Sequence, residues 1–98
     1  MAAEQDIQEI REIIQTRLAQ YPVRIFLFGS HATGQAHSTS DVDVAVLPEI
    51  DLPAGLLSQV REDLEESNVL YKVDLVDISK TDEAFRQRVL SEAVEWID

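Results

Sequence analysis

The stretch FLFGSHATGQAHSTSDVDVAV, residues 26–46, decides the fold. Gly29-Ser30 ends one apolar run, and Asp41-Val42-Asp43 opens the next one after ten intervening residues. On a strand, Asp41 and Asp43 project from the same face, roughly 6.5 to 7 Å apart. Ionised carboxylates at that spacing repel each other, and desolvating either one is costly unless it is paired or binds a metal ion. The stretch therefore indicates a site that needs both charges.

Asp41 and Asp43 suit a divalent cation that carries a nucleotide. Magnesium takes oxygen ligands, usually one or two protein carboxylates together with substrate phosphates. Glycine lets the backbone approach a phosphate closely, and the hydroxyl of Ser30 offers a hydrogen-bond donor beside Gly29. For an isolated Asp-x-Asp in an acidic chain, the alternative is that both side chains lie on a solvated strand face. These residues alone leave that alternative open.

A third acidic residue, Asp74, lies in the middle of the apolar run YKVDLVD, residues 71–77. An unpaired carboxylate inside a strand is costly. If this strand lies beside the strand of Asp41 and Asp43, three carboxylates converge. In the earlier strand, valines alternate with the charged positions, so we expect one face to be core and the other to carry the charges.

The period of the apolar residues predicts a mixed three-stranded α/β domain. Helical spacing occurs in three segments: residues 3–20, a segment from Pro53 to a close at Ser67-Asn68, and a last segment that reaches Ile97 after a cap at Ser79 or Thr81. Strand-like runs cover residues 23–28, 41–47 and 71–78. With a short helical turn after Gly29, the expected order is helix, strand, short helix, strand, helix, strand, helix.

Composition limits the function further. The chain has 98 residues, 45% of them apolar, which predicts one domain spanning residues 1–98 with a modest core. Its 8 Lys and Arg against 19 Asp and Glu give a net charge of −11, which opposes the phosphate neutralisation that nucleic-acid binding requires. The sequence has no cysteine and no apolar run of about 18 residues, and its first ten residues lack a basic patch followed by an apolar core. We therefore expect a soluble cytoplasmic protein that binds neither nucleic acid directly nor a membrane.

The spacing of Gly29-Ser30 and Asp41-Val42-Asp43 resembles the nucleotidyltransferase signature of the DNA polymerase beta superfamily. The longer pattern, which adds Ala32, Gly34 and Ser40, is similar to that of the minimal nucleotidyltransferase, or MNT, branch. The ending KVDLVDISKTDEAFRQRVLSEAVEWID is similar to the carboxyl-terminal strand and helix of MNT proteins, so we expect a nearly complete domain with the nucleotidyltransferase fold.

The resemblance implies a role for each matching residue. Gly29 and Ser30 would bind the nucleoside triphosphate, and Asp41 and Asp43 would ligate two magnesium ions. Asp74 would be the third carboxylate, on the metal that activates the attacking hydroxyl. Asp77 is a competing candidate for that third position.

The chain departs from the family pattern at two positions. MNT proteins often carry arginines where this chain has His31 and Thr33, so fixed positive charge is missing near the expected triphosphate. Lys72, Arg24 or Lys80 could compensate, although each is also typical of an ordinary strand-edge charge. His31 and His37 are candidate phosphate donors, or else loop histidines without a role.

The resemblance also implies a partner. Free-standing MNT proteins are commonly paired, as antitoxins, with a small helical HEPN toxin, and transfer AMP from ATP to a toxin tyrosine. The net charge suits a basic ribonuclease partner in a hetero-oligomer. The apolar last helix, above all Trp96, is predicted to lie at the interface. The alternatives are a binding-only antitoxin that neutralises its partner by contact and a transferase that modifies small molecules.

Overall fold

The computed structural model describes residues 2–35 and 41–97. The helices are α1 (Ala2–Leu18), α2 (Ser30–Thr33), α3 (Leu56–Glu65) and α4 (Glu83–Glu92), with a 3-10 helix η1 (Ile78–Lys80). The strands are β1 (Val23–Phe28), β2 (Val42–Pro48), β3 (Val73–Asp77) and β4 (Val94–Trp96). Within these residues, no helix is both long enough and apolar enough to cross a membrane.

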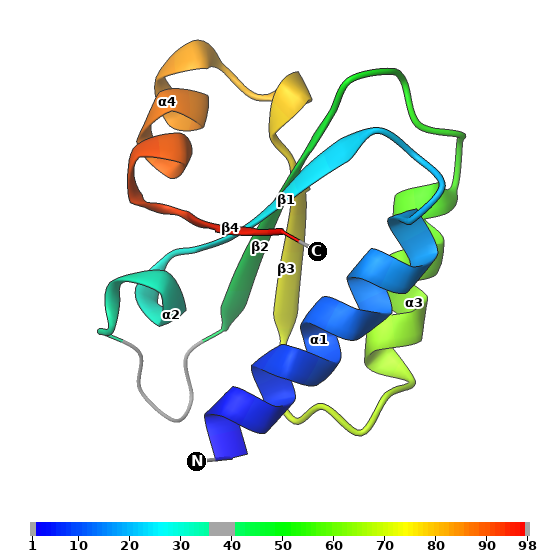
Figure 1. Ribbon diagram of the computed structural model, residues 1–98, viewed down its shortest axis with the longest axis vertical. Helices are drawn as coiled ribbons and strands as arrows, with labels where there is room; N and C mark the ends of the chain where they lie inside the picture. Colours follow the sequence, from blue (N-terminus) through cyan, green and yellow to red (C-terminus); the bar gives the residue numbers. More distant parts are fainter. Residues whose placement is uncertain (1, 36–40, 98) are drawn as a thin grey trace.

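The strands form one mixed sheet in the order β3-β2-β1-β4 (Figure 1). β2 is parallel to β3, whereas β1 is antiparallel to both β2 and β4. The predicted α/β class and the order of elements as far as α4 are confirmed. The predicted count of three strands is wrong, because β4 adds a fourth at the edge beside β1.

Apolar side chains pack on both faces of the sheet. The valines of β2 join α1, α3 and one side of β1 in the larger cluster. On the opposite face, α4 and η1 cover a smaller cluster, which contains Phe26, Ala45, Ile78 and Val89. The face of β2 expected to carry the charges therefore also contributes to the core, since Ala45 is fully buried there.

The carboxyl-terminal residues form a strand where a helix was predicted. α4 ends at Glu92, because Ala93 adopts an extended conformation with φ −77° and ψ 154°. The chain then pairs with β1, which places Trp96 opposite Ile25 in the larger core cluster. Trp96 is 8% exposed, so the prediction that it lies at a partner interface is wrong.

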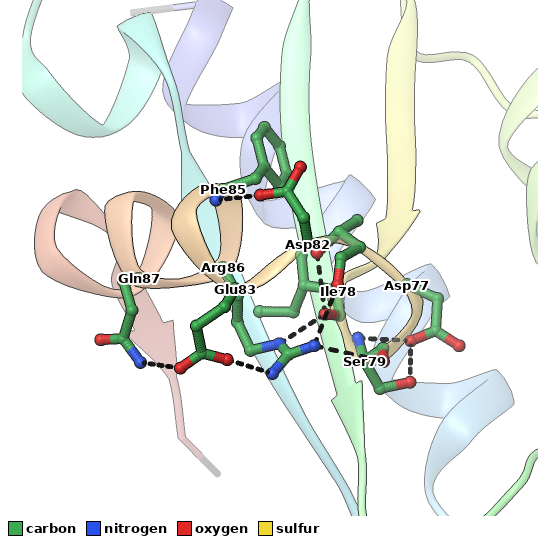
Figure 2. A network of polar contacts seen from close by, with 9 residues as sticks. Asp77, Ile78, Ser79, Asp82, Glu83, Phe85, Arg86 and Gln87 are labelled. Carbon is green, nitrogen blue, oxygen red and sulfur yellow. Dashed lines mark hydrogen bonds and ion pairs between the residues drawn. The ribbon is translucent and has the colours of Figure 1, made fainter.

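Polar contacts hold α4 against the end of β3 (Figure 2). Asp82 is the N-cap and accepts a hydrogen bond of 2.8 Å from the Phe85 N–H, so the predicted caps at Ser79 and Thr81 are wrong. Arg86 donates to the carbonyl oxygens of Ile78 and Thr81 at 2.8 and 3.0 Å. These bonds fix the direction in which α4 leaves the sheet.

Trp96→Ala is expected to lower the free energy of unfolding by about 3 to 5 kcal/mol, because it removes a large side chain from the core. Ile97→Ala is the matched control, since Ile97 is 70% exposed and should change stability by less than about 0.5 kcal/mol. Chemical denaturation measures both values. Equal, small losses in the two variants would contradict the placement of Trp96 in the core.

Candidate functional site

Two of the predicted carboxylates are neighbours across the sheet. Asp43 of β2 is in register with Asp74 of β3, and the two strands are parallel. Both side chains are half-buried and line the same cavity of about 560 Å³. Because the strands of a sheet lie about 4.8 Å apart, paired residues on one face bring their carboxylates close together. The expectation that the two strands lie side by side is confirmed.

Gly29 lies directly against the carboxylate of Asp43. It follows Phe28, the residue of β1 that pairs with Asp43, and has φ +76°. A Cβ at residue 29 would overlap Oδ2 of Asp43 and lie 3.2 Å from its Cγ. A side chain is therefore excluded both by space and by backbone conformation. The Gly29 carbonyl accepts bonds from the N–H groups of Ala32 and Thr33 as α2 begins at Ser30.

The other two acidic candidates are placed differently. Asp41 is exposed and precedes β2, although its charge still influences Asp43. Asp77 ends β3 opposite Val46 and accepts bonds from the N–H and hydroxyl of Ser79. Of the two candidates for the third carboxylate, Asp74 is the one beside Asp43, while Asp77 caps η1.

The electrostatics of the site are dominated by negative charge. Burial raises the pKa of Asp43 above its usual value, and the charges of Asp74 and then Asp41 raise it further. His31 opposes this shift by lowering the pKa of Asp43, so His31 belongs to the site. The His31 ring also meets Tyr71 edge-on, at a centroid distance of 5.2 Å. His37, the second candidate histidine, lies outside the described residues.

The three cations considered as substitutes for the family arginines differ in position. Lys72 lines the cavity with Asp43 and Asp74. Arg24 instead forms a two-bond contact with Glu95, at 2.8 and 3.1 Å, on the opposite edge of the sheet. Lys80 ends η1 and is not among the residues that line the cavity. Lys72 alone of the three is therefore placed at the carboxylates.

The chemistry of the donors suits a hard cation, since carboxylate oxygens are the ligands that magnesium prefers. In residues 2–35 and 41–97, however, no group of three or more acidic or histidine side chains is arranged to hold a metal ion. Asp43 and Asp74 provide two paired carboxylates, and one or two is the usual number for magnesium bound together with substrate phosphates. The residues thus fit a cation that arrives with a nucleotide better than a permanently bound metal.

α4 contributes a part of the site that was not predicted from the sequence. Phe85 lines the carboxylate cavity, and its ring meets the ring of Phe28 edge-on at a centroid distance of 6.3 Å. Phe85 and Arg88 also line a second hollow, of about 310 Å³, which contains Gly29. The spacing of these residues on a helix was visible in the sequence, but the element they would face was not.

Comparisons with known proteins agree with this geometry. The family described as Polymerase beta, Nucleotidyltransferase matches residues 8–97. A Haemophilus influenzae protein named as a probable protein adenylyltransferase, MntA, is 31% identical over 83 residues, which cover 85% of this chain and 71% of the relative. A Methanocaldococcus jannaschii protein, also named as a protein adenylyltransferase, is 36% identical over 92 residues, covering 92% of this chain and 97% of the relative.

A solved structure described as a toxin-antitoxin with AMP-PNP has a similar fold. Its TM-score is 0.69, and its sequence is 28% identical to that of this chain. The match covers 89% of this chain and 73% of the other.

The raised pKa of Asp43 predicts that Asp43→Asn stabilises the nucleotide-free protein at pH 7, where the wild-type carboxylate is ionised and close to Asp74. A raised pKa in the folded state favours protonation, so the gain should disappear below the ordinary pKa of 3.8. Melting temperatures measured from pH 3 to pH 8 test this expectation.

Asp63→Asn is the matched control with the opposite sign. A hydrogen bond from Arg17 lowers the pKa of Asp63, so its carboxylate stabilises the fold above the ordinary pKa and loses this effect as pH falls. Asp63→Asn should therefore lower the melting temperature slightly at pH 7 and leave it unchanged in acid. A decrease at pH 7 for Asp43→Asn as well would argue against repulsion at the site.

Proposed function

The chain belongs to the Polymerase beta nucleotidyltransferase family, and we propose that it transfers AMP from ATP to a tyrosine of a cognate HEPN-type toxin. It would thereby act as a magnesium-dependent protein adenylyltransferase and an antitoxin. One observation carries the proposal: the Gly29 backbone abuts Asp43, which is in register with Asp74. Phosphate-binding backbone and paired carboxylates thus meet at one place. The names of the two relatives and the toxin-antitoxin structure with AMP-PNP support this reading.

Each site residue has a proposed task. The backbone at Gly29 and the hydroxyl of Ser30 bind the triphosphate. Asp41, Asp43 and Asp74 would hold two magnesium ions, which would lower the pKa of the acceptor hydroxyl and neutralise charge on the phosphates.

The transfer itself is a displacement at the α-phosphorus of ATP. The tyrosine oxygen forms a bond to this phosphorus, the bond to the bridging oxygen breaks, and pyrophosphate leaves in line. The phenolic proton passes to a carboxylate oxygen of Asp74. Phe28, Tyr71 and Phe85 give the cavity apolar walls that suit an aromatic acceptor side chain.

The partner must bring its tyrosine to this cavity. Because Trp96 is buried, the partner would instead bind at the surface around Asp43 and Asp74. The net charge of −11 favours a basic partner, with which the chain would form a hetero-oligomer in the cytoplasm. Residues 1–98 would act as a single minimal nucleotidyltransferase domain.

Catalysis predicts that a small amount of this protein modifies an excess of the purified partner. Intact mass should rise by one or more AMP units per partner molecule, and Asp43→Asn should slow this by about 1,000-fold or more. Asp77→Asn is the control, since Asp77 caps η1 away from Asp43. Full neutralisation of the partner by Asp43→Asn, without a mass change, would favour the binding-only antitoxin.

Ligand binding predicts a rise in melting temperature when millimolar magnesium and ATP are added together, because the nucleotide complex binds only the folded state. Asp43→Asn should abolish most of this rise. Differential scanning fluorimetry with ATP alone, magnesium alone and both separates the contributions. An equal shift in wild type and Asp43→Asn would contradict the assignment of Asp43 to the metal.

A further inference from the structure

Arg88 differs from the other five arginines in the contacts it makes. Each of the others donates at least one hydrogen bond. The acceptors are Gln15 and Ile97 for Arg11, Asp63 for Arg17, Glu95 for Arg24, Leu75 for Arg61, and four residues for Arg86. The Arg88 guanidinium instead lies over the Phe85 ring, with its central carbon 5.5 Å from the ring centroid. Within the described residues, it forms neither a hydrogen bond nor an ion pair. Its donors are therefore available to a ligand.

The position of Arg88 directs those donors toward the site. The α4 residues Phe85, Arg88, Val89 and Glu92 line a hollow of about 310 Å³ together with Phe28 and Gly29. Residues spaced by three and four lie on one face of a helix, so this face of α4 covers the point where β1 ends. Among the described residues, the one arginine without a hydrogen bond or ion pair thus shares a hollow with the glycine that abuts Asp43.

This hollow adjoins the carboxylate cavity. Phe28 and Phe85 line both spaces, and their rings meet edge-on between them. Gly29 lines the hollow and abuts Asp43 of the cavity, so a triphosphate bound at Asp43 and Asp74 would have this hollow beside it. Asp43 and Asp74 make the neighbouring cavity negative, and a triphosphate adds to this charge. Lys72 lines that cavity, whereas Arg88 is the one cationic residue among those that line the hollow.

The anchoring of α4 fixes the backbone that carries Arg88, whose side chain is exposed. Asp82 caps the helix, and Arg86 ties it to the carbonyl oxygens of η1 and of the residue after it (Figure 2). Stacking on Phe85 further restricts the guanidinium without using its N–H groups. A preorganised guanidinium presents paired donors that match phosphate oxygens.

We propose that Arg88 binds the β- and γ-phosphates of the nucleoside triphosphate and supplies from α4 a fixed positive charge that neither His31 nor Thr33 provides. The inference rests on the proposed function and adds to it a phosphate-binding residue. Glu92 is the competing partner for the guanidinium, one turn further along α4 in the same hollow. If Arg88 paired with Glu92 in solution, its removal would leave nucleotide affinity unchanged.

Isothermal titration with AMP-PNP and with AMP, both with millimolar magnesium, tests this assignment. Arg88→Gln is expected to weaken AMP-PNP binding by about 10- to 100-fold, the effect of losing charged hydrogen bonds, and to leave AMP binding within about twofold. Arg88→Lys keeps the positive charge but loses the paired N–H donors of the guanidinium, so its affinity for AMP-PNP should lie between those of wild type and Arg88→Gln. Arg17→Gln is the matched control, because it removes the same charge from α1, and should change AMP-PNP binding by less than about threefold.

The outcomes separate the inference from the proposed function. If wild type binds AMP-PNP and Arg88→Gln binds it equally well, the role of Arg88 is overturned and the proposed function stands. Equal losses in Arg88→Gln and Arg17→Gln also overturn it, because the effect would then be one of overall charge. If wild type binds neither nucleotide, both the inference and the proposed function fail. Melting curves of each variant show that it is folded.

Discussion

The site depends on the absence of a side chain at residue 29. Pairing of β1 with β2 places Phe28 opposite Asp43, so the next residue of the chain lies against the Asp43 carboxylate. Any Cβ there would take the space of the carboxylate oxygen, and the positive φ adds a backbone penalty for other residues. Glycine therefore allows the same strand pairing that builds the sheet to bring the turn between β1 and α2 to the acidic pair.

The ionised carboxylates at Asp43 destabilise the fold, and other parts of the structure offset this cost. Burial and two neighbouring carboxylates raise the pKa of Asp43, which means that the ionised site opposes folding at neutral pH. Apolar clusters on both faces of the sheet supply the compensating stability. Charge that is unfavourable in the free protein and favourable around a cation is typical of a binding site.

Most helices and strands could be predicted from the sequence, because the spacing of their apolar residues is clear. It failed at residues 93–97, where apolar residues continue the helical spacing of α4 although the chain is extended. The preference for a strand there comes from the open edge of β1, a tertiary partner that no local pattern reveals. The same limit applied to the caps, since Asp82, Thr81 and Ser79 are all suitable N-cap residues by type.

The prediction of the candidate site had a similar limit. Acidic residues inside apolar runs indicated that Asp43 and Asp74 would meet, and the register of β2 and β3 places them together. Between Asp74 and Asp77 the sequence left a choice, because both lie in one apolar run, three residues apart. The position of Arg88 beside Gly29 could not be predicted, because it depends on where α4 crosses the sheet.

α4 explains why the second face of the sheet is both core and site. Its residue Val89 packs on Phe26 and Ala45, while Phe85 and Arg88 extend over the end of β1. One helix thus closes the smaller core and borders the cavity, and its orientation is set by bonds that Arg86 makes to the chain after β3. Because β3 also carries Asp74, the contacts that dock α4 fix its side chains relative to the carboxylates. The placement of Phe85 and Arg88 relative to the carboxylates therefore depends on the contacts that anchor α4 to the end of β3.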